Sequence, residues 1–345
     1  MESDDWGSIR IPDLAAKNRL MDLGLLSVHD PFSKFDTLES ADDLEALFSV
    51  LNQFNDEKGN SPVITANIVV GNPDFQKIKY SDFSEYYFEA FTQTYQNLSV
   101  GVDPFSVMQK GIDEGLFFPQ YHAREHLNVS TWMQLLQSGD EAFRKAFESG
   151  CFSIDYKARG NRRNNLMAAY DYNTVEDLSF IRRSISEGLA LFEQHFQFKS
   201  ITTIAPCYVW DAAIEDIFLE NGVAVFQGSR FQNTPQPNSS DFKKIFHYNG
   251  EKVKEKVYLS RNGLFEPSIN QNIHWVDKAM ESIATAFAWN KPAVIGTHRL
   301  NYVGSLVPEN RDRNLRTLAQ LLTQVLQKWP DVEFVNSAEL ADLYQ

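Results

Sequence analysis

The fold is decided by PVITANIVV (62–70), a stretch of nearly continuous apolar and β-branched residues. A strand with one face in water would alternate apolar and polar residues, and this one does not. Continuous apolar strands are typical of parallel sheets that helices cover on both faces. We therefore expect a buried strand of an α/β protein at these positions.

The segments on either side of this strand repeat the alternation of helix and strand. Ser40 and Asp43 form a capping-box pattern at the start of DDLEALFSVLNQF (42–54), whose apolar spacing predicts a helix. Further strands are predicted at LFFPQ (116–120), SITTIAP (200–206) and KPAVIGT (291–297). This repetition favours one α/β domain over residues 1–345, built as a distorted (β/α) TIM-like barrel.

Residues 229–272 interrupt the repetition. The stretch NTPQPNSSD (233–241) is rich in turn residues, and KKIFHYNGEKVKEKVYLSRNG (243–263) has the pattern of a hairpin around Asn249–Gly250. We expect this segment to be a hairpin insertion on the barrel.

Composition and charge narrow the classes of partner. The 345 residues include 46 Asp and Glu against 32 Lys and Arg, which gives a formal charge of -14. Such a charge repels nucleic acid and anionic lipid, so neither is an expected partner. Oligomeric state is left open.

The beginning of the chain and the cysteines bear on location. MESDDWGSIR (1–10) lacks the basic start and apolar middle of a signal peptide, and no apolar run approaches the roughly 18 residues of a membrane span. Cys151 and Cys207 form no CxxC pair, which favours a reducing compartment. We expect a cytoplasmic protein. Because Asp4 and Asp5 stand so near the start, we also expect a truncated chain in which the first barrel strand is missing.

Adjacent carboxylates form the first of three polar groups at strand ends, where barrels of this kind place their active sites. Asp4 and Asp5 lie in SDDWG (3–7), next to apolar residues. Packing two carboxylates together is costly unless a cation neutralises one of them. Taken alone, the pair is more typical of a solvated acidic segment.

Two histidines form the second group. His122 and His126 stand four residues apart in FFPQYHAREHLNV (117–129). Neutral imidazoles at this spacing can bind one Zn²⁺ at about 2.0–2.1 Å. An isolated pair is more often one surface histidine and one capping histidine. With Asp5 as a third ligand the set becomes an open site for a divalent metal, most consistent with Zn²⁺.

His298, after the apolar strand KPAVIGT, is the third group. A histidine fixed at a barrel mouth can act as a general acid, or it can orient another residue. Both roles are open. The other histidines lie in helix or hairpin patterns outside these motifs and are interpreted as structural: His29, His195, His247 and His274.

The order of these motifs resembles the NodB-homology polysaccharide deacetylases, and more faintly the YdjC-type carbohydrate deacetylases. The resemblance runs from residue 3 to about residue 300. It is strongest with a divergent branch that carries DDWG, HxREH and THRxNY motifs, which match SDDWG (3–7), HAREH (122–126) and THRLNY (297–302). The family's fold is a distorted barrel of seven strands.

The resemblance implies a metal-dependent hydrolase that removes acetyl groups from N- or O-acetylated oligo- or polysaccharide. It makes Asp5, His122 and His126 the metal ligands, with Asp4 as the general base and His298 as the general acid. In APCYV (205–209), the backbone N–H of Tyr208 stands where the family stabilises the oxyanion. Five aromatic residues near the motifs are candidates for exposed sugar-stacking surfaces: Trp6, Tyr121, Tyr208, Trp210 and Tyr302.

The sequence departs from the family pattern at two positions of that loop. Ala205 replaces the arginine that orients the catalytic aspartate, and Val209 replaces a glycine. Three arginines could supply the missing guanidinium, and the sequence does not choose among them: Arg10, Arg124 and Arg299.

Two other functions compete with the hydrolase. Without the family arginine, the barrel could bind glycan and not turn it over. HAREH also fits the H-x-x-E-H pattern of a zinc protease, in which Glu125 would be the base. That pattern needs both histidines on one helical face, and it leaves SDDWG and His298 without a role.

Overall fold

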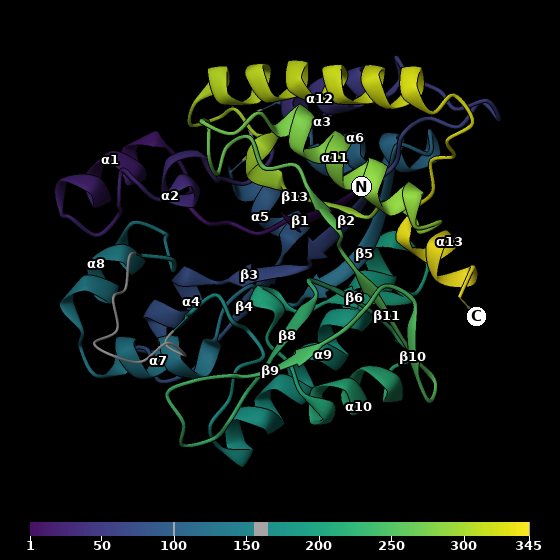
Figure 1. Ribbon diagram of the computed structural model, residues 1–345. Coiled ribbons are helices and arrows are strands. Elements are labelled where there is room, and N and C mark those ends of the chain that lie inside the picture. The colour runs from purple at the N-terminus through teal and green to yellow at the C-terminus, as the bar shows by residue number, and fades with distance from the viewer. Residues whose placement is uncertain (99–100, 155–164, 345) are drawn as a thin grey trace.

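Helices lie on both sides of a central group of strands (Figure 1) in the computed structural model, which describes residues 1–98, 101–154 and 165–344. One side is covered by α3 (Ala41–Leu51), α6 (Pro104–Asp113), α11 (Trp275–Ala288) and α12 (Pro308–Lys328). The other side carries α9 (Val175–Phe196) and α10 (Ala212–Glu220). The predicted α/β organisation is confirmed.

The remaining helices are short. They are α1 (Leu14–Asp22), α2 (Pro31–Phe35), α4 (Phe75–Tyr80), α5 (Phe91–Leu98), α7 (Val129–Gln137), α8 (Glu141–Glu148) and α13 (Ser337–Asp342), with 3-10 turns η1 (Pro206–Tyr208) and η2 (Arg299–Asn301). Most of them lie at the ends of strands, where they frame the loops described below.

The main sheet has nine strands in one continuous order, where the resemblance implied seven. The order is β10 (Glu251–Val253), β11 (Lys256–Ser260), β7 (Val225–Gly228), β6 (Thr202–Ile204), β5 (Phe117–Ala123), β2 (Ile64–Val69), β1 (Glu2–Trp6), β13 (Ile295–His298) and β12 (Gly263–Leu264). All neighbours are parallel except β10 and β11. Every residue of β2 is buried, as its continuous apolar sequence predicts.

Residues 229–272 contribute to this sheet, so the prediction of a separate insertion is wrong for their second half. Ser260 in β11 pairs with Gly228 of β7, and three residues later Gly263 in β12 pairs with Ile295 of β13. Residues 261 and 262 therefore connect β11, near one end of the strand order, to β12 at the other end. The reason lies in the VYLS part of β11, whose four residues are all buried.

Two small antiparallel pairs lie outside the main sheet. They are β3 (Gly71–Pro73) with β4 (Phe88–Ala90), and β8 (Phe231–Thr234) with β9 (Lys243–Phe246). The turn between β10 and β11 is formed by Lys254 and Glu255, and not by Asn249–Gly250 as predicted. Gly250 instead begins the approach to β10 and donates its N–H to the Tyr258 carbonyl at 2.8 Å.

The strand that leads into Asp4 and Asp5, which the sequence analysis expected to be missing, is present. β1 pairs with β2 on one side and β13 on the other, and all five of its residues are buried. The Met1 carbonyl accepts a hydrogen bond from Thr65 N–H at 2.8 Å. The strand is short, yet it occupies the middle of the sheet and carries Asp4 and Asp5 at its end.

A large apolar cluster fixes the helices to the strands. Leu47 and Leu51 of α3 belong to it, together with Ile64 and Ile68 of β2 and Leu318 of α12. Burial of each such side chain typically stabilises a fold by about 1.5–3 kcal/mol. The capping box predicted from the sequence is formed at the start of α3.

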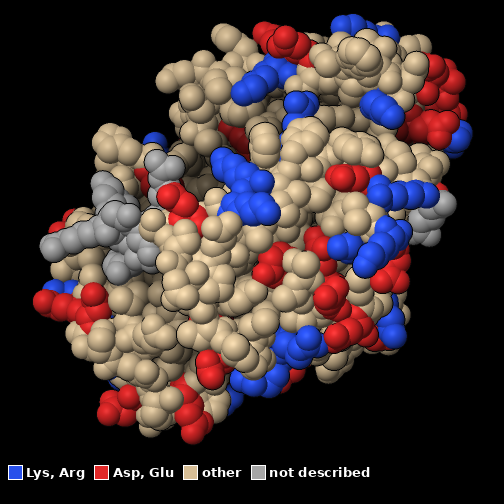
Figure 2. All heavy atoms as spheres, turned by 60° about the horizontal axis from the view of Figure 1, so that its bottom comes forward, with Lys and Arg blue, Asp and Glu red and all other residues tan. Residues whose placement is uncertain are grey.

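The surface and the helices bear on the expected partners. On the face shown in Figure 2, basic and acidic side chains are interspersed. None of the helices in the described residues is both long and apolar enough to cross a bilayer.

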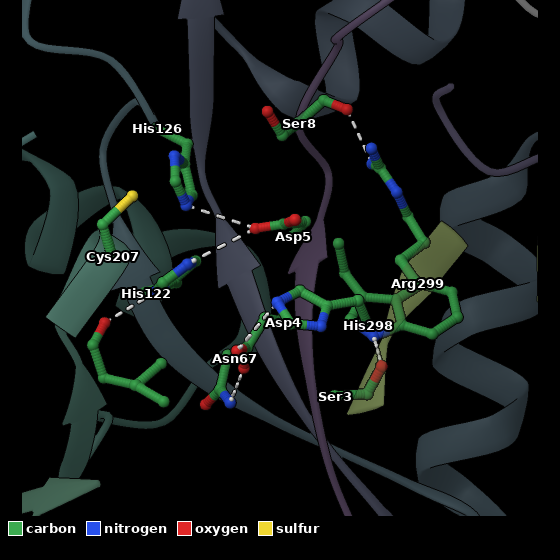
Figure 3. Close-up of polar contacts among 12 residues, drawn as sticks. Ser3, Asp4, Asp5, Ser8, Asn67, His122, His126, Cys207, His298 and Arg299 are labelled. Atoms are coloured by element: carbon green, nitrogen blue, oxygen red, sulfur yellow. Dashed lines mark hydrogen bonds and ion pairs between the residues drawn. The ribbon is translucent and has the colours of Figure 1, made fainter. Parts of the chain in front are cut away.

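A buried arginine ties the end of β13 to the loops after β1 and before α3. Arg299 is fully buried and donates to Asp36 at 2.9 Å, to Glu39 at 2.9 Å and to the Ser8 carbonyl at 2.6 Å. Figure 3 shows its guanidinium turned toward Ser8 and away from Asp4. Arg299 therefore has a bracing role, with its donors committed to these partners.

We expect Arg299→Leu to lower the free energy of unfolding in urea by about 3–5 kcal/mol, because removal of one partner leaves buried carboxylates without compensation. The control is Arg182→Leu, which breaks a half-exposed ion pair with Glu220. That change should cost about 1 kcal/mol or less. Equal losses in the two variants would contradict the bracing role.

Candidate metal and catalytic site

The two carboxylates at the end of β1 face one cavity because the backbone is irregular there. Successive side chains of a regular strand point to opposite faces. At Asp5 the backbone adopts φ 77°, and the register of β1 against β2 shifts between Ser3 and Trp6. Asp4 and Asp5 consequently both line a cavity of about 250 Å³. A non-glycine residue in this left-handed region typically costs about 1–3 kcal/mol, and such strain is concentrated at functional sites.

Asp5, His122 and His126 converge from three elements. Asp5 Oδ1 lies 3.6 Å from His122 Nε2 and 3.3 Å from His126 Nε2 (Figure 3). One donor atom from each residue lies within 4.8 Å of the other two. His122 is in β5 and His126 is in the loop before α7. The four-residue spacing between them therefore spans the end of the strand and does not form a helical turn.

Hydrogen bonding and burial prepare both imidazoles as ligands. His122 Nδ1 lies 2.6 Å from the Ile204 carbonyl, which can only accept, so Nδ1 carries the proton and Nε2 keeps its lone pair. Burial lowers the pKa of His126 to about 3, which keeps this ring neutral at ordinary pH. A neutral His126 ring, and an Nε2 of His122 directed at Asp5, suit metal coordination, which requires an unprotonated nitrogen.

The geometry fits a divalent cation. Two ligand atoms at about 2.0–2.1 Å from one ion in a tetrahedral shell lie about 3.3–3.5 Å apart. The separation from Asp5 to His126, 3.3 Å, lies in this range, and the separation from Asp5 to His122, 3.6 Å, is slightly longer. His122 Nε2 is buried and has no hydrogen-bond partner among the described residues. A buried lone pair that faces a carboxylate is unfavourable unless a cation lies between them.

Asp4 has different neighbours from Asp5. Arg261 holds it with two parallel hydrogen bonds, from Nη1 at 2.7 Å and from Nη2 at 2.6 Å. The Asn67 amide donates to the same carboxylate at 2.8 Å. Burial alone would raise the pKa of Asp4, but the contacts with Arg261 outweigh it and lower the pKa below its usual value. Asp4 is ionised and fixed in orientation.

The guanidinium that orients Asp4 was missed by sequence reasoning. The candidates were Arg10, Arg124 and Arg299, and none of them contacts Asp4 within the described structure. Arg261 follows β11, in the segment that the sequence analysis treated as an insertion. A signal was available in the apolar run before SRNG (260–263), which is typical of a buried strand that ends at an arginine.

His298 lies on the other side of Asp4. Its Nε2 is 3.8 Å from Asp4 Oδ2, and its Nδ1 is 2.6 Å from Glu266 Oε1. Burial lowers the pKa of His298, but the charge and hydrogen bond of Glu266 outweigh this effect and raise the pKa to about 9. The ring is therefore cationic at neutral pH. It also lines the cavity, which it closes together with Phe32 at a ring distance of 5.5 Å.

Tyr208 lines the cavity through its side chain. The Tyr208 N–H donates to the Ala205 carbonyl at 2.9 Å, so this amide is occupied in the structure, and its oxyanion role stays a prediction. The phenol accepts from Arg261 Nη1 at 3.3 Å. Burial raises the pKa of Tyr208 to about 12, so its hydroxyl keeps a proton that it can donate.

The protease alternative does not match the geometry. Glu125 accepts two hydrogen bonds from Arg124, both at 2.6 Å, and is buried. His122 is on a strand and His126 is in a loop, so the motif has no helical face. Glu125 and Arg124 brace the loop that carries His126, and no acid from HAREH is left to act as a base.

The prediction of an exposed aromatic surface near the motifs is wrong for four of the five residues. The side chains of Trp6, Tyr121, Trp210 and Tyr302 are buried, and Tyr208 alone of the five lines the cavity. Trp6 packs against Phe117 with a ring distance of 5.1 Å. These rings belong to the core because they lie on strands and loops that face the interior.

Comparisons with known proteins add little. No protein-family model matches the sequence, and a search of curated proteins finds no match. Among solved structures, one match is described as a "putative polysaccharide deacetylase" from Mycobacterium smegmatis, with 8% identity, a TM-score of 0.43, and coverage of 99% of this chain and 90% of that one.

Two other solved structures are GH57-type branching enzymes. The one from Thermococcus kodakaraensis has 12% identity and a TM-score of 0.37, and 98% of this chain matches 66% of it. The one from Pyrococcus horikoshii has 11% identity and a TM-score of 0.39, with coverage of 98% and 64%. At these scores the likeness carries no argument about function, which has to come from the site itself.

The Asp–His–His group generates a binding prediction. We expect the purified protein to bind one equivalent of Zn²⁺, and His122→Ala to weaken this binding by more than the 10–100-fold that loss of an outer contact typically costs. Isothermal titration calorimetry and metal analysis measure both quantities. His29→Ala, in an exposed turn, is the control. Unchanged affinity in His122→Ala would remove the site.

The contact between Glu266 and His298 generates a titration prediction. In the metal-free protein, NMR titration of the imidazole should give a pKa of about 9 for His298, and Glu266→Gln should lower it. Because the folded pKa is raised, the stabilisation from this contact is complete below about pH 6.5 and is lost as the pH rises through about 9. Glu141→Gln, at an exposed helix position, should leave the His298 titration unchanged.

Proposed function

We propose that the protein is a metal-dependent hydrolase that removes acetyl groups from N- or O-acetylated carbohydrate. One observation carries the proposal. A single cavity is lined by a metal-ligand set, by an ionised carboxylate held by an arginine, and by a cationic histidine. Hydrolysis of an ester or amide needs these three elements: an activated water, a proton acceptor and a proton donor.

The ligand set favours Zn²⁺ among divalent cations. Two imidazoles beside one carboxylate suit Zn²⁺ better than the hard cations Mg²⁺ and Ca²⁺, which prefer a shell of oxygen ligands. Asp5, His122 and His126 would hold the ion. When bound, it supplies Lewis acidity and lowers the pKa of water in its open position toward about 7.

The residues of the chain divide the proton transfers between them. Asp4, ionised and held by Arg261 and Asn67, is placed to accept a proton from the attacking water. His298, kept cationic by Glu266, is placed to protonate the departing sugar hydroxyl or amine. The Tyr208 hydroxyl lines the same cavity and can donate to the oxygen that becomes negative.

Arg261 bears on the choice between hydrolase and glycan-binding barrel. The binding-only alternative was motivated by the absence of the arginine that orients the base. Arg261 supports the hydrolase because it supplies a bidentate guanidinium to Asp4 from a different strand end. A barrel that only binds sugar has no need for a buried, oriented carboxylate beside a metal site.

We expect Asp4→Asn to lower the rate of acetate release by about 10²–10⁴-fold, the usual contribution of general acid–base catalysis, while one equivalent of metal is still bound. Acetate is measured from acetylated xylan, chitin oligosaccharides and 4-nitrophenyl acetate. The matched control is Asp22→Asn on the exposed face of α1. Glycan binding without acetate release from any of these compounds would overturn the proposal and favour the binding-only barrel.

A further inference from the structure

Two aromatic side chains are exposed side by side on the β8–β9 pair. Phe231 and Phe246 are cross-strand partners, and their rings lie 5.7 Å apart at an interplanar angle of 67°. Their exposed fractions are 49% and 56%. Exposed large apolar groups in contact with each other mark binding surfaces more often than single exposed residues do. We call these two residues the aromatic platform.

The aromatic platform shares a face of the hairpin with Asn233, a residue that contacts the rim of the cavity. Residues two apart on a strand point to the same side, so Asn233 shares the face of Phe231. The Asn233 amide donates to the Cys207 carbonyl at 3.4 Å, and Cys207 lines the proposed catalytic cavity. A ligand that extends from the cavity along this face meets the platform.

The hairpin is fixed to the rim by its other contacts. Trp210 N–H donates to the Asn233 carbonyl at 3.0 Å, and the Gln232 amide donates to the Trp210 carbonyl at 2.7 Å. Gln232 also contacts His247 at 2.8 Å. The platform is therefore held at a set position relative to the cavity, as a binding surface for an extended ligand requires.

A basic residue, Lys244, shares the face of the platform in a protein that is acidic as a whole. Arg230, Lys243 and Lys244 are exposed on this hairpin, and Lys244 Nζ lies 5.8 Å from the centre of the Phe231 ring. Neither lysine forms an ion pair within the part of the chain that the structure describes. The chain as a whole has a formal charge of -14, so an exposed lysine beside the platform stands out from its surroundings. It favours an anionic ligand at this place.

We propose that the aromatic platform binds an acidic polysaccharide chain whose acetylated residue occupies the cavity. This inference rests on the proposed function and names its substrate class: a polymer of pyranose units that carry carboxylates. The apolar C–H face of a pyranose packs on an aromatic ring, and Lys244, on the same face of the hairpin, faces the carboxylates. A second copy of this chain fits less well, since a stable dimer needs about 800 Å² per partner, far more than two half-exposed rings offer.

The experiment measures binding apart from catalysis. The zinc-loaded full chain is run in affinity gels that contain acetylated polygalacturonate or, for comparison, neutral acetylated xylan. We expect retardation by the acidic polymer, and a dissociation constant about tenfold larger for the double variant Phe231→Ala/Phe246→Ala, which corresponds to about 1.4 kcal/mol. Lys244→Gln should weaken binding of the acidic polymer and leave binding of xylan unchanged.

The control variant, and the results that would contradict the aromatic platform, differ from those that test the proposed hydrolase. Trp289→Ala removes an aromatic residue that is 76% exposed at the end of α11, and should bind as the wild type does. Circular dichroism melting shows whether each variant is folded. Wild-type affinity in the folded Phe231→Ala/Phe246→Ala protein, no binding of either polymer by the wild type, or a change of oligomeric state in the variant would overturn the platform. Release of acetate from 4-nitrophenyl acetate would still support the hydrolase in each of these cases.

Discussion

Carboxylates are buried where β1 ends, and the cost of removing them from water decides how the surrounding residues are arranged. The penalty is several kcal/mol for each ion even after relaxation, so each needs a partner. Asp4 has Arg261, with two hydrogen bonds shorter than 2.8 Å. Asp5 has Arg10 only at 3.8 Å, because Arg10 makes its closer contact with Asp36 at 2.9 Å. Among the described residues Asp5 therefore has no close arginine, and with His122 and His126 it forms a buried group that could hold a metal ion.

The difference between two adjacent residues of the same type is the basis of the site. A regular strand would have placed Asp4 and Asp5 on opposite faces, and the left-handed backbone at Asp5 brings both into the cavity. Their environments then separate them. Asp4 is surrounded by fixed donors, which keep it ionised, whereas Asp5 faces the Nε2 atoms of two histidines. Assignment of acid, base and ligand roles follows from such differences in environment.

Local patterns in the sequence predicted what depends on neighbours along the chain. The strand at 62–70 and the capping box at Ser40 follow from local spacing and residue type. The convergence of Asp5 with His122 and His126 was expected because all three were placed at strand ends of one α/β fold. Features set by long-range packing were missed. Residues 229–272 have the turn residues of a hairpin, and only the pairing of β11 with β7 and of β12 with β13 shows that they belong to the sheet. The partner of Asp4 was hidden for the same reason.

The position of Arg261 explains how Asp4 is oriented although the loop after β6 starts with Ala205 and supplies no arginine. A guanidinium presents five N–H donors in a planar fork and can hold several acceptors at once. Arg261 contacts Glu2, Asp4 and the Tyr208 hydroxyl together. Its path also requires Gly296 on β13, where a Cβ atom would lie 2.6 Å from Arg261 Cδ. The orientation of Asp4 is thus coupled to the short passage between β11 and β12. Because Arg261 orients Asp4, the loop after β6 does not have to supply an arginine for this purpose. Ala205, at the start of that loop, packs in the core.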